Sequence, residues 1–391
     1  MTLAQFLGSK PLFYDVIDYA RFPAAYESIR SFLSLPKLIH IVGTNGKGST
    51  GRFLATAFHR AGKKTGHYTS PHIIRFNERV WMDGEEISDE VLENAHQKLL
   101  GLLSSEYAYA LSYFEYTTLL AMVVFEECEY VVLEAGLGGE FDATNVFDKI
   151  LSIFTPIALD HSAFLGNTIE SIAATKLRSM QSVALMGKQP YIETKIIARQ
   201  IANEKKTDIK CIDGMASPEI KECALHIAIK NDLSDYLRDN LELAMAAYEV
   251  LGYTAEKMLF DQKALFGRLT KINDNITLDV GHNVLAARVI AEAFVGQKVT
   301  LIYNTYADKD YQEILTILAP IIESVEIIEV DEARIVEQEL LESALHNLGI
   351  RYCTFQKIRE DKKYLVFGSF SVAEAFIKFY TLLEQSPNEL R

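Results

Sequence analysis

The sequence predicts an α/β protein with two domains, each built on a mostly parallel sheet, the second smaller than the first. Three observations lead to this fold class. Short apolar runs alternate with helical patterns, which is typical of strands buried on both faces of a parallel sheet. One of these runs leads directly into a glycine-rich turn that starts at Gly43. A second alternation begins after Phe266, and 391 residues are too many for one ordinary core.

The first domain is expected to contain strands and helices in alternation. Apolar runs bounded by polar or glycine residues predict strands at Ile39 to Val42, Thr65 to Thr69, Tyr130 to Leu133 and Ile150 to Thr155. A period near 3.6 predicts helices at Thr50 to Arg60, Ser88 to Leu103, Thr117 to Glu127 and Asp239 to Leu251. The resulting order is that of a parallel sheet covered by helices on both faces.

The second domain is expected to be a compact, doubly wound, Rossmann-like α/β unit. Its strands are predicted at Ile276 to Val280, Val299 to Tyr303, Val325 to Val330, Arg351 to Phe355 and Tyr364 to Phe367. Its helices are predicted at Val284 to Phe294, Tyr311 to Leu318, Val336 to Leu348 and Val372 to Leu383. We expect the boundary near residue 268, which gives domains of residues 1–268 and 269–391.

Composition and charge restrict the class of protein. The 39 lysines and arginines against 53 acidic residues give a net charge of −14, and a chain this acidic is a poor nucleic-acid binder. The cysteines lie far apart without a C-x-x-C pair, which indicates reduced thiols rather than a zinc site or disulfides, at Cys128, Cys211, Cys223 and Cys353. No segment is typical of a signal peptide or a membrane span, so we expect a soluble, cytoplasmic protein.

The most informative segment follows the apolar run Lys37 to Val42 and reads Gly43-Thr44-Asn45-Gly46-Lys47-Gly48-Ser49. Glycines let several backbone N–H groups point at one anion, the following helix adds the positive end of its dipole, and the lysine neutralises further charge. The spacing departs from G-x-x-x-x-G-K-[ST] because Gly48 separates the lysine from the serine. The segment predicts a P-loop that cradles phosphate; the alternative is a strand-to-helix turn without a ligand.

Polar side chains follow three predicted apolar runs, and ligands of open α/β sheets bind beyond the carboxyl ends of the strands. Ser70 closes the run from Gly66, Glu134 closes the run from Val131, and His161 follows Ile157-Ala158-Leu159-Asp160. If these strands neighbour the Gly43 turn, the three side chains lie near the terminal phosphates. A carboxylate and a hydroxyl suit Mg²⁺, and water would complete the shell. Taken singly, Glu134 could be a polar strand-end residue that contacts a helix start, and His161 is more often a structural histidine than a ligand. Together at strand ends, they favour a metal site.

These residues belong to a set of motifs that resembles the folylpolyglutamate synthase / dihydrofolate synthase family, within the Mur-type ATP-dependent amide ligases. The resemblance covers both domains in the family's order. The motifs that carry it are Gly43 to Ser49, Ser70 to Arg79, Tyr113 to Thr117, Glu134 to Asn145, Leu159 to Gly166, Gly267 to Leu269 and Asp279 to Asn283.

The resemblance implies an ATP site with bound Mg²⁺. The nucleotide would be held by residues of the turn and by residues further along the chain, namely Thr44, Asn45, Gly46, Lys47, Gly48, Ser49, Asn240, Arg268, Asp279 and His282. Mg²⁺ would be held by Ser70, Glu134 and His161. Lys176 matches a family lysine that is carbamylated, which would turn an ammonium into an anion able to support a second metal ion. Lys47, Glu134, His161 and Lys176 are the expected catalytic residues.

The resemblance also implies a pterin-bearing substrate, which aromatic faces and a few fixed polar groups would hold. The matching positions are Arg75, Ser112, Tyr113, Phe114, Glu115, Phe141, Asp142 and Ala143. From the residues alone, Tyr113 and Phe114 are equally compatible with core packing.

The reaction that the resemblance implies is ATP-dependent formation of an amide through an acyl phosphate, with L-glutamate as the amine. The acceptor would be dihydropteroate, a reduced folate that already carries glutamate, or both, and we expect a bifunctional, monomeric enzyme. Three alternatives stay open: a folylpolyglutamate synthase only, a Mur-type cell-wall ligase, and a nucleotide-binding switch without ligase chemistry. The cell-wall ligases usually place the hydroxyl residue directly after the lysine and carry an additional N-terminal domain.

Overall fold

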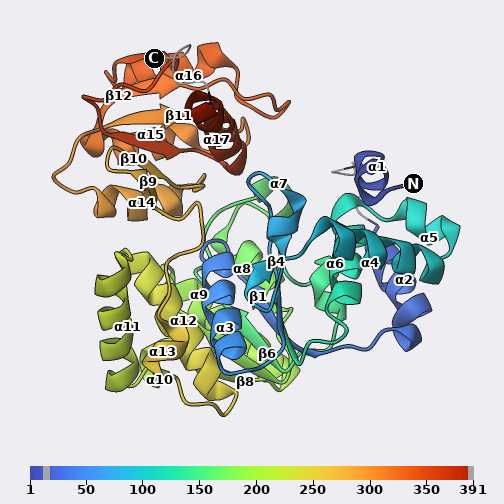
Figure 1. Cartoon of the computed structure of the whole chain (residues 1–391). Helices are drawn as coiled ribbons and strands as arrows, with labels where there is room; N and C mark the ends of the chain where they lie inside the picture. Colours follow the sequence, from blue (N-terminus) through green and yellow to red (C-terminus); the bar gives the residue numbers. More distant parts are fainter. Residues whose placement is uncertain (12–17, 386–391) are drawn as a thin grey trace. The chain divides into compact units, whose positions relative to one another are not determined.

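The computed structural model describes residues 1–11 and 18–385, which divide into two compact units (Figure 1). The first unit comprises Met1–Leu233 and Leu237–Gln262, and the second comprises Ser234–Tyr236 and Lys263–Arg391. The expected boundary near residue 268 lies just inside the second unit. That unit also takes in the start of helix α12 (Asp235–Val250), a contribution that no pattern in the sequence indicates.

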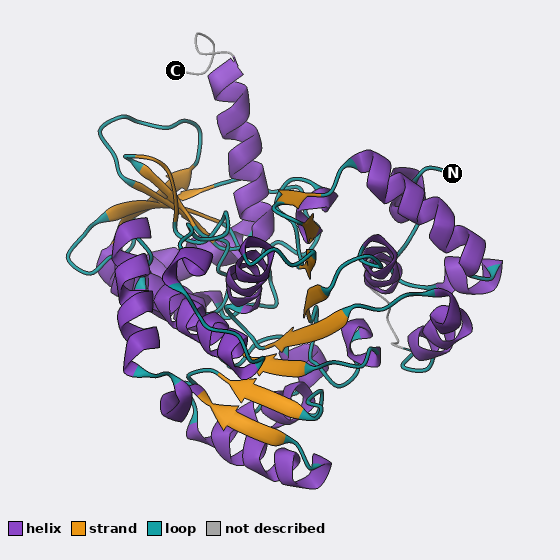
Figure 2. Ribbon diagram, turned by 60° about the horizontal axis from the view of Figure 1, so that its bottom comes forward, coloured by secondary structure: helices purple, strands orange, loops and turns teal. Residues whose placement is uncertain are grey.

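The first unit is built on a sheet of eight described strands in the order β4-β3-β2-β5-β1-β6-β7-β8. The pairs from β2 across to β8 are parallel, whereas β3 and β4 extend one edge in antiparallel fashion. Figure 2 shows the sheet's arrows side by side with helices packed around them. The strands are β1 (Lys37–Val42), β2 (Thr65–Tyr68), β3 (Val80–Met82), β4 (Glu85–Glu86), β5 (Tyr130–Glu134), β6 (Leu151–Phe154), β7 (Val183–Met186) and β8 (Asp208–Cys211).

The helices of the first unit bury apolar stripes against this sheet and against one another. Several begin at side-chain caps, as α6 does at Ser112, whose hydroxyl accepts the backbone N–H of Glu115. The helices are α1 (Leu3–Gly8), α2 (Arg21–Ile29), α3 (Lys47–Arg60), α4 (Asp89–Leu102), α5 (Ser105–Ala110), α6 (Tyr113–Val124), α7 (Ser162–Leu165), α8 (Ile169–Leu177), α9 (Ile192–Lys205), α10 (Ile212–Met215), α11 (Pro218–Asn231), α12 and α13 (Lys257–Phe260).

The second unit contains a sheet of six described strands in the order β13-β12-β11-β14-β10-β9, parallel except for the antiparallel pair β9–β10. Its strands are β9 (Thr270–Asn273), β10 (Ile276–Leu278), β11 (Val299–Tyr303), β12 (Ile322–Ile327), β13 (Tyr352–Thr354) and β14 (Tyr364–Phe367). Its helices are α14 (Val284–Ala293), α15 (Tyr311–Leu318), α16 (Gln338–Asn347) and α17 (Phe370–Gln385).

The predicted α/β class with two mostly parallel sheets is confirmed. The structure adds antiparallel strands at one edge of each sheet. Of these, β4 and β9 carry mostly polar residues, and β3 is apolar but only three residues long, so no apolar run revealed them. It also places the stretch 157–160 in a loop, since β6 ends at Phe154. His161 therefore does not follow a strand directly, as the sequence had suggested. Helix α3 begins earlier than predicted, at Lys47.

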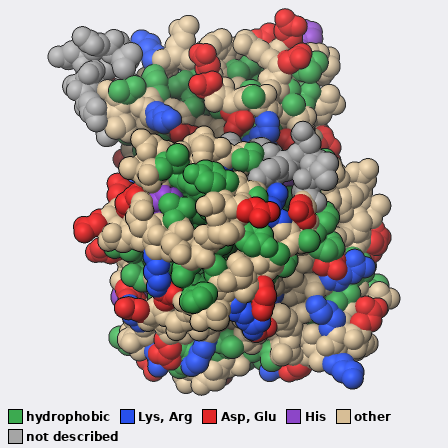
Figure 3. All heavy atoms as spheres, turned by 90° about the vertical axis from the view of Figure 1, so that its right-hand side faces the viewer, with side chains coloured by type: hydrophobic (Ala, Val, Ile, Leu, Met, Phe, Trp, Pro, Cys, Tyr) green, Lys and Arg blue, Asp and Glu red, His purple; other side chains and the backbone are tan. Residues whose placement is uncertain are grey.

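No described helix is long and apolar enough to cross a membrane. Figure 3 shows acidic and basic side chains interspersed with apolar ones over one face of the molecule. The net charge of −14 is therefore not gathered into a single patch on that face.

Candidate active site

The glycine-rich turn lies between the carboxyl end of β1 and the start of α3. Gly46 precedes the helix with φ 86°, a left-handed conformation that favours glycine. The first N–H groups of a helix have no intrahelical acceptor, and here they belong to Lys47, Gly48 and Ser49. The side chain of Asn240, on α12, lies against the turn, because a Cβ at Gly46 would be 2.5 Å from its Oδ1. The turn thus has the form of an anion cradle.

The loop after β6 braces the turn from one side. The N–H groups of Thr44 and Asn45 donate to the carbonyl of Pro156 at 2.8 and 3.3 Å. The Thr44 hydroxyl donates to the Ala158 carbonyl at 3.1 Å and accepts the Ala158 N–H at 3.0 Å. The N–H and hydroxyl of Thr44 and the N–H of Asn45 are thus engaged in holding the turn against this loop.

A buried carboxylate stands beside the lysine of the turn. Lys47 donates to the Thr44 carbonyl at 3.2 Å, and its Nζ lies 3.7 Å from Oε1 of Glu134. The other oxygen of Glu134 accepts the Thr69 hydroxyl and, at 3.4 Å, the N–H of Ser70. The strand order β2-β5-β1 explains the cluster, since the carboxyl ends of three neighbouring parallel strands meet at one edge. Lys47, Ser70 and Glu134 are therefore brought together as predicted.

His161 approaches the same edge from the loop after β6, the neighbour of β1. It has φ 53° and caps α7, and its N–H donates to Oδ1 of Asp160 at 2.8 Å. Its Nε2 lies 4.0 Å from Oδ2 of Asp160. Among residues 1–11 and 18–385, no three His, Cys, Asp or Glu side chains form a group that could hold a metal ion. A metal ion at this edge would thus take much of its shell from elsewhere.

Lys176, on α8, contacts the first residue of the glycine-rich turn. Its side chain is buried, and Nζ donates to the carbonyl of Gly43 at 3.1 Å. Burial, helped by the nearby charge of Lys47, lowers the pKa of Lys176 to about 7, although Asp160 and Asp142 oppose the shift. A substantial fraction of this amine is therefore neutral near neutral pH.

The residues predicted to hold a pterin fall on two elements of the first unit. Ser112 to Glu115 form the start of α6, where Glu115 also accepts the Ser112 N–H at 2.7 Å and completes a capping box. Tyr113 and Phe114 are partly buried against the core, and the Arg79 guanidinium lies 5.2 Å from the centre of the Tyr113 ring. Arg75 is exposed, with Nη2 4.0 Å from Oδ1 of Asp89.

The second element is the loop from Gly136 to Asn145. Phe141 is 58% exposed, whereas Asp142 and Ala143 are buried. Asp142 accepts the N–H of Leu137 at 2.8 Å and both the N–H and hydroxyl of Thr144 at 2.9 and 2.5 Å. Burial raises the pKa of Asp142 despite these bonds. Asp142 thus holds the loop together by accepting these hydrogen bonds, a role that the sequence did not indicate.

In the second unit, Asp279 organises the turn after β10. It accepts the N–H groups of Leu269 and Gly281 at 2.9 and 2.7 Å and the Tyr236 hydroxyl at 3.0 Å. The guanidinium of Arg268 stacks over the Phe370 ring at 5.4 Å.

His282 follows that turn, and its Nδ1 lies 3.1 Å from the carbonyl of Val280. The predicted nucleotide residues of this unit are thus gathered around one turn.

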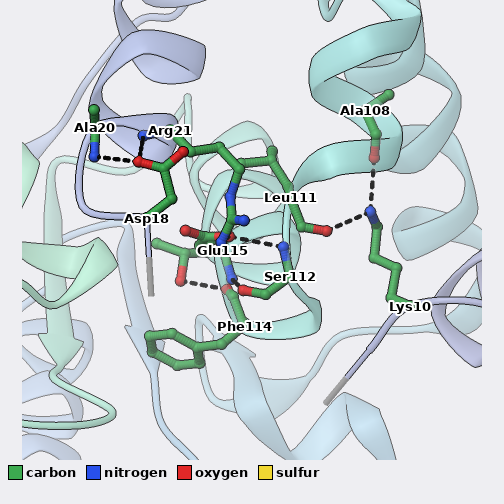
Figure 4. Close-up of polar contacts among 10 residues, drawn as sticks. Lys10, Asp18, Ala20, Arg21, Ala108, Leu111, Ser112, Phe114 and Glu115 are labelled. Carbon is green, nitrogen blue, oxygen red and sulfur yellow. Dashed lines mark hydrogen bonds and ion pairs between the residues drawn. The ribbon is translucent and has the colours of Figure 1, made fainter. Parts of the chain in front are cut away.

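Four side chains with roles at these sites escaped the sequence prediction: Thr69, Asp160, Tyr236 and Arg21. Thr69 and Asp160 each directly precede a predicted ligand, so the position was informative although the role was not. Tyr236 bonds Asp279, and Arg21 pairs with Glu115 (Figure 4). Both partners are distant in the sequence, so no local pattern reveals these contacts.

Comparison with known proteins decides the family. No family model matches the chain. The dihydrofolate synthase/folylpolyglutamate synthase of Buchnera aphidicola subsp. Acyrthosiphon pisum is 33% identical over 305 residues, which cover 71% of this chain and 71% of that relative. The chain belongs to the dihydrofolate synthase/folylpolyglutamate synthase family. It is therefore an enzyme of this ligase family, as the motifs predicted.

Solved structures agree with this family. The crystal structure of Helicobacter pylori folylpolyglutamate synthetase is 40% identical, with a TM-score of 0.80 over 97% of this chain and 98% of that one. Two more distant structures, each 24% identical, share the fold with TM-scores of 0.82 and 0.81. One is Escherichia coli FolC in complex with DHPP and ADP (98% and 99% covered), and the other is the bifunctional Yersinia pestis enzyme with AMPPNP and a Mn ion (97% and 98% covered).

Proposed function

We propose that the chain ligates L-glutamate to both dihydropteroate and the γ-carboxylate of folylglutamates, with ATP as the phosphoryl donor. Membership of the dihydrofolate synthase/folylpolyglutamate synthase family supports the reaction class. The single observation that carries the proposal is the buried Glu134 carboxylate beside Lys47 at the end of a glycine-rich turn. A cell-wall ligase and a nucleotide switch gain no support from the relatives.

The chemistry follows from the residues around the turn. The acceptor carboxylate attacks the γ-phosphorus of ATP, forming an acyl phosphate and releasing ADP. The amino group of glutamate then attacks the acyl carbon, phosphate leaves, and the amine loses its proton to solvent. The N–H groups of the turn and Lys47 would hold the phosphates and stabilise the charge on the transferred group. Asn240, Arg268, Asp279 and His282 complete the nucleotide site in this proposal.

The donor set fits Mg²⁺. Magnesium in phosphoryl-transfer sites usually takes one or two carboxylates, substrate phosphates and water. Glu134 supplies one buried carboxylate beside the turn, with Ser70 just after β2 and His161 from the loop after β6 as further proposed ligands. When bound, the ion neutralises charge on the phosphates. Removing the carboxylate while keeping its shape, as in Glu134→Gln, should therefore abolish metal-dependent ATP binding, measured by calorimetry.

We further propose that Lys176 is carbamylated. Its neutral amine would attack CO₂, forming an N–C bond and releasing a proton, and the lowered pKa makes that neutral form available. The product is an anion that can support a second metal ion. A ¹³C carbamate signal from protein under labelled CO₂ with ADP and Mg²⁺, absent in Lys176→Met, would support this. A wild-type spectrum without the signal would overturn it.

A folylpolyglutamate synthase that lacks the dihydropteroate reaction is the second candidate, since the 40%-identical Helicobacter pylori structure is described by that activity alone. Incorporation of labelled glutamate should be measured separately with dihydropteroate and with tetrahydrofolate, with and without ATP. Incorporation with both acceptors supports bifunctionality. Incorporation with tetrahydrofolate alone leaves the second candidate, and ATP hydrolysis indifferent to both acceptors refutes the ligase assignment.

Two further expectations complete the proposal. The enzyme is a monomer, and it acts on its small-molecule substrates in the cytoplasm. All four cysteines are free thiols in the structure, which agrees with a reducing compartment. Light scattering during gel filtration tests the oligomeric state.

A further inference from the structure

The loop between β7 and α9, residues 187–191, carries a glutamine that makes three hydrogen bonds to the backbone. Oε1 of Gln189 accepts the N–H of Ile157 at 3.0 Å, and Nε2 donates to the carbonyls of Thr155 and Gly187 at 3.1 and 3.2 Å. One side-chain amide thus uses its acceptor and both of its N–H donors. Two of the three bonds reach the loop after β6, the parallel neighbour of β7.

The stretch that Gln189 holds is the one that braces the glycine-rich turn. Pro156 and Ala158 bond the turn, as described above, and the N–H between them donates to Gln189. Thr155 lies directly against the turn, because a Cβ at Gly43 would be only 1.9 Å from its Oγ1. The bonds of Gln189 go to no residue of the turn itself, so its effect on the turn passes through residues 155–158.

The loop that carries Gln189 is itself anchored, so this side chain can act as a brace. The N–H of Gly187 donates to the carbonyl of the last residue of β6 at 2.8 Å. A Cβ at Gly187 would lie 2.8 Å from Cδ2 of Leu243, so the loop packs closely on α12. In close-packed interiors a side chain held on a fixed element transmits little freedom to its partners.

We propose that Gln189 is a positioning residue for the nucleotide. It fixes residues 155–158, and these hold the glycine-rich turn in the form that binds phosphate. The inference rests on the proposed function, because it assumes that the turn holds ATP. Within the described part of the chain, Gln189 makes no hydrogen bond to the start of α6 or to the Gly136–Asn145 loop, so its loss should affect ATP and spare the acceptor.

The opposite end of the same strand pair offers a matched control. Oε1 of Gln181 accepts the N–H of Lys149 at 3.0 Å, a bond of the same kind and length that also joins residues 32 positions apart. Gln181 precedes β7 and Gln189 follows it, so only Gln189 lies at the sheet edge that carries the turn. Leucine at either position leaves the N–H of a buried residue without its acceptor. Both variants should therefore lose stability, and only one should lose ATP binding.

The kinetic test measures glutamate incorporation with tetrahydrofolate as the acceptor. Gln189→Leu should raise the KM of ATP about five- to thirty-fold and change the KM of the acceptor by less than about two-fold. Gln181→Leu should leave the KM of ATP within about two-fold of the wild type. Gln189→Glu keeps an oxygen for the N–H of Ile157, so it should recover part of the ATP affinity, and it gives the same comparison if Gln189→Leu does not fold. Equal rises in the KM of ATP in both leucine variants, or no rise in either Gln189 variant, would overturn the proposal.

Hydrogen exchange tests the bracing without a substrate. The N–H groups of Thr44 and Asn45 donate to Pro156, so Gln189→Leu should speed their exchange by about five-fold or more, and Gln181→Leu should not. Unaltered exchange at both amides would overturn the proposal even if ATP binding weakens. If the wild type does not bind ATP, the proposed function fails instead, and exchange at these two amides still decides whether Gln189 holds the turn.

Discussion

Gly46→Ala should damage the phosphate turn in two ways that can be measured separately. Gly46 has φ 86°, a conformation that costs a residue with a Cβ about 1–2 kcal/mol. In addition, the new Cβ would lie 2.5 Å from Oδ1 and 3.0 Å from Cγ of Asn240, closer than real contacts allow. Moving a buried side chain to relieve such an overlap costs about 1–3 kcal/mol.

The chain offers a closely matched control for the first of these effects. Gly252 has φ +87°, and a Cβ there would meet nothing within 4 Å. Gly252→Ala should therefore lower the free energy of unfolding by about 1–2 kcal/mol, and Gly46→Ala by roughly 2–5 kcal/mol. The difference between the two variants measures the overlap with Asn240.

Urea unfolding of the two variants gives this difference in the free energy of unfolding. The KM of ATP reports whether the turn still binds the nucleotide. Asn240→Ala in the Gly46→Ala background removes the overlap and should restore stability to near that of Gly252→Ala. Equal losses in the two single variants would refute the reasoning. So would a double variant that is no more stable than Gly46→Ala.

Three further outcomes follow from buried polar groups. The pKa of Lys176 is about 7 when folded and 10.5 when unfolded, so the unfolded chain binds more protons between these values and this group makes stability rise with pH. Lys176→Met should flatten the pH dependence of unfolding above pH 7 by up to about 1.4 kcal/mol per pH unit, and equal slopes would contradict this. Tyr236→Phe removes a 3.0 Å hydrogen bond to buried Asp279 and should lower the free energy of unfolding of the second unit by about 1–3 kcal/mol in calorimetry, with no change counting against it. His40→Leu removes one of the two partners of the buried Thr144 hydroxyl, at 2.7 Å from His40 Nε2, and leaves the bond to Asp142. It should lower the free energy of unfolding by about 1–3 kcal/mol in urea, and a neutral result would show that the bond to His40 is dispensable.

Much of the fold could be predicted because its strands are buried on both faces. Such strands are apolar without interruption, and β11 and β14 were predicted to the residue. Edge strands such as β8, whose burial is only partial, carry polar residues and were missed. The short helices α1 and α5 also escaped, since too few turns exist to show a period.

In the candidate site, too, features formed by neighbouring residues could be predicted, and contacts between distant segments could not. The turn from Gly43 to Ser49 could be recognised because every group in it is local in sequence. The partner of Glu115 could not be foreseen, since Arg21 reaches it from 94 residues away in the sequence. Asp142 is held by Leu137 and Thr144 within its own loop, and no motif in the sequence indicates that role.

By itself, the sequence determined the α/β class, the glycine-rich turn and the family, because periodicity, composition and motifs are properties of neighbouring residues. Only the tertiary structure decided which strand ends meet, and so that Glu134 lies beside Lys47. It also decided that Lys176 is buried, which lowers its pKa, and that Arg21 holds Glu115. Desolvation and pairing depend on distances in space, and those arise only when the parallel sheet brings separate segments to one edge.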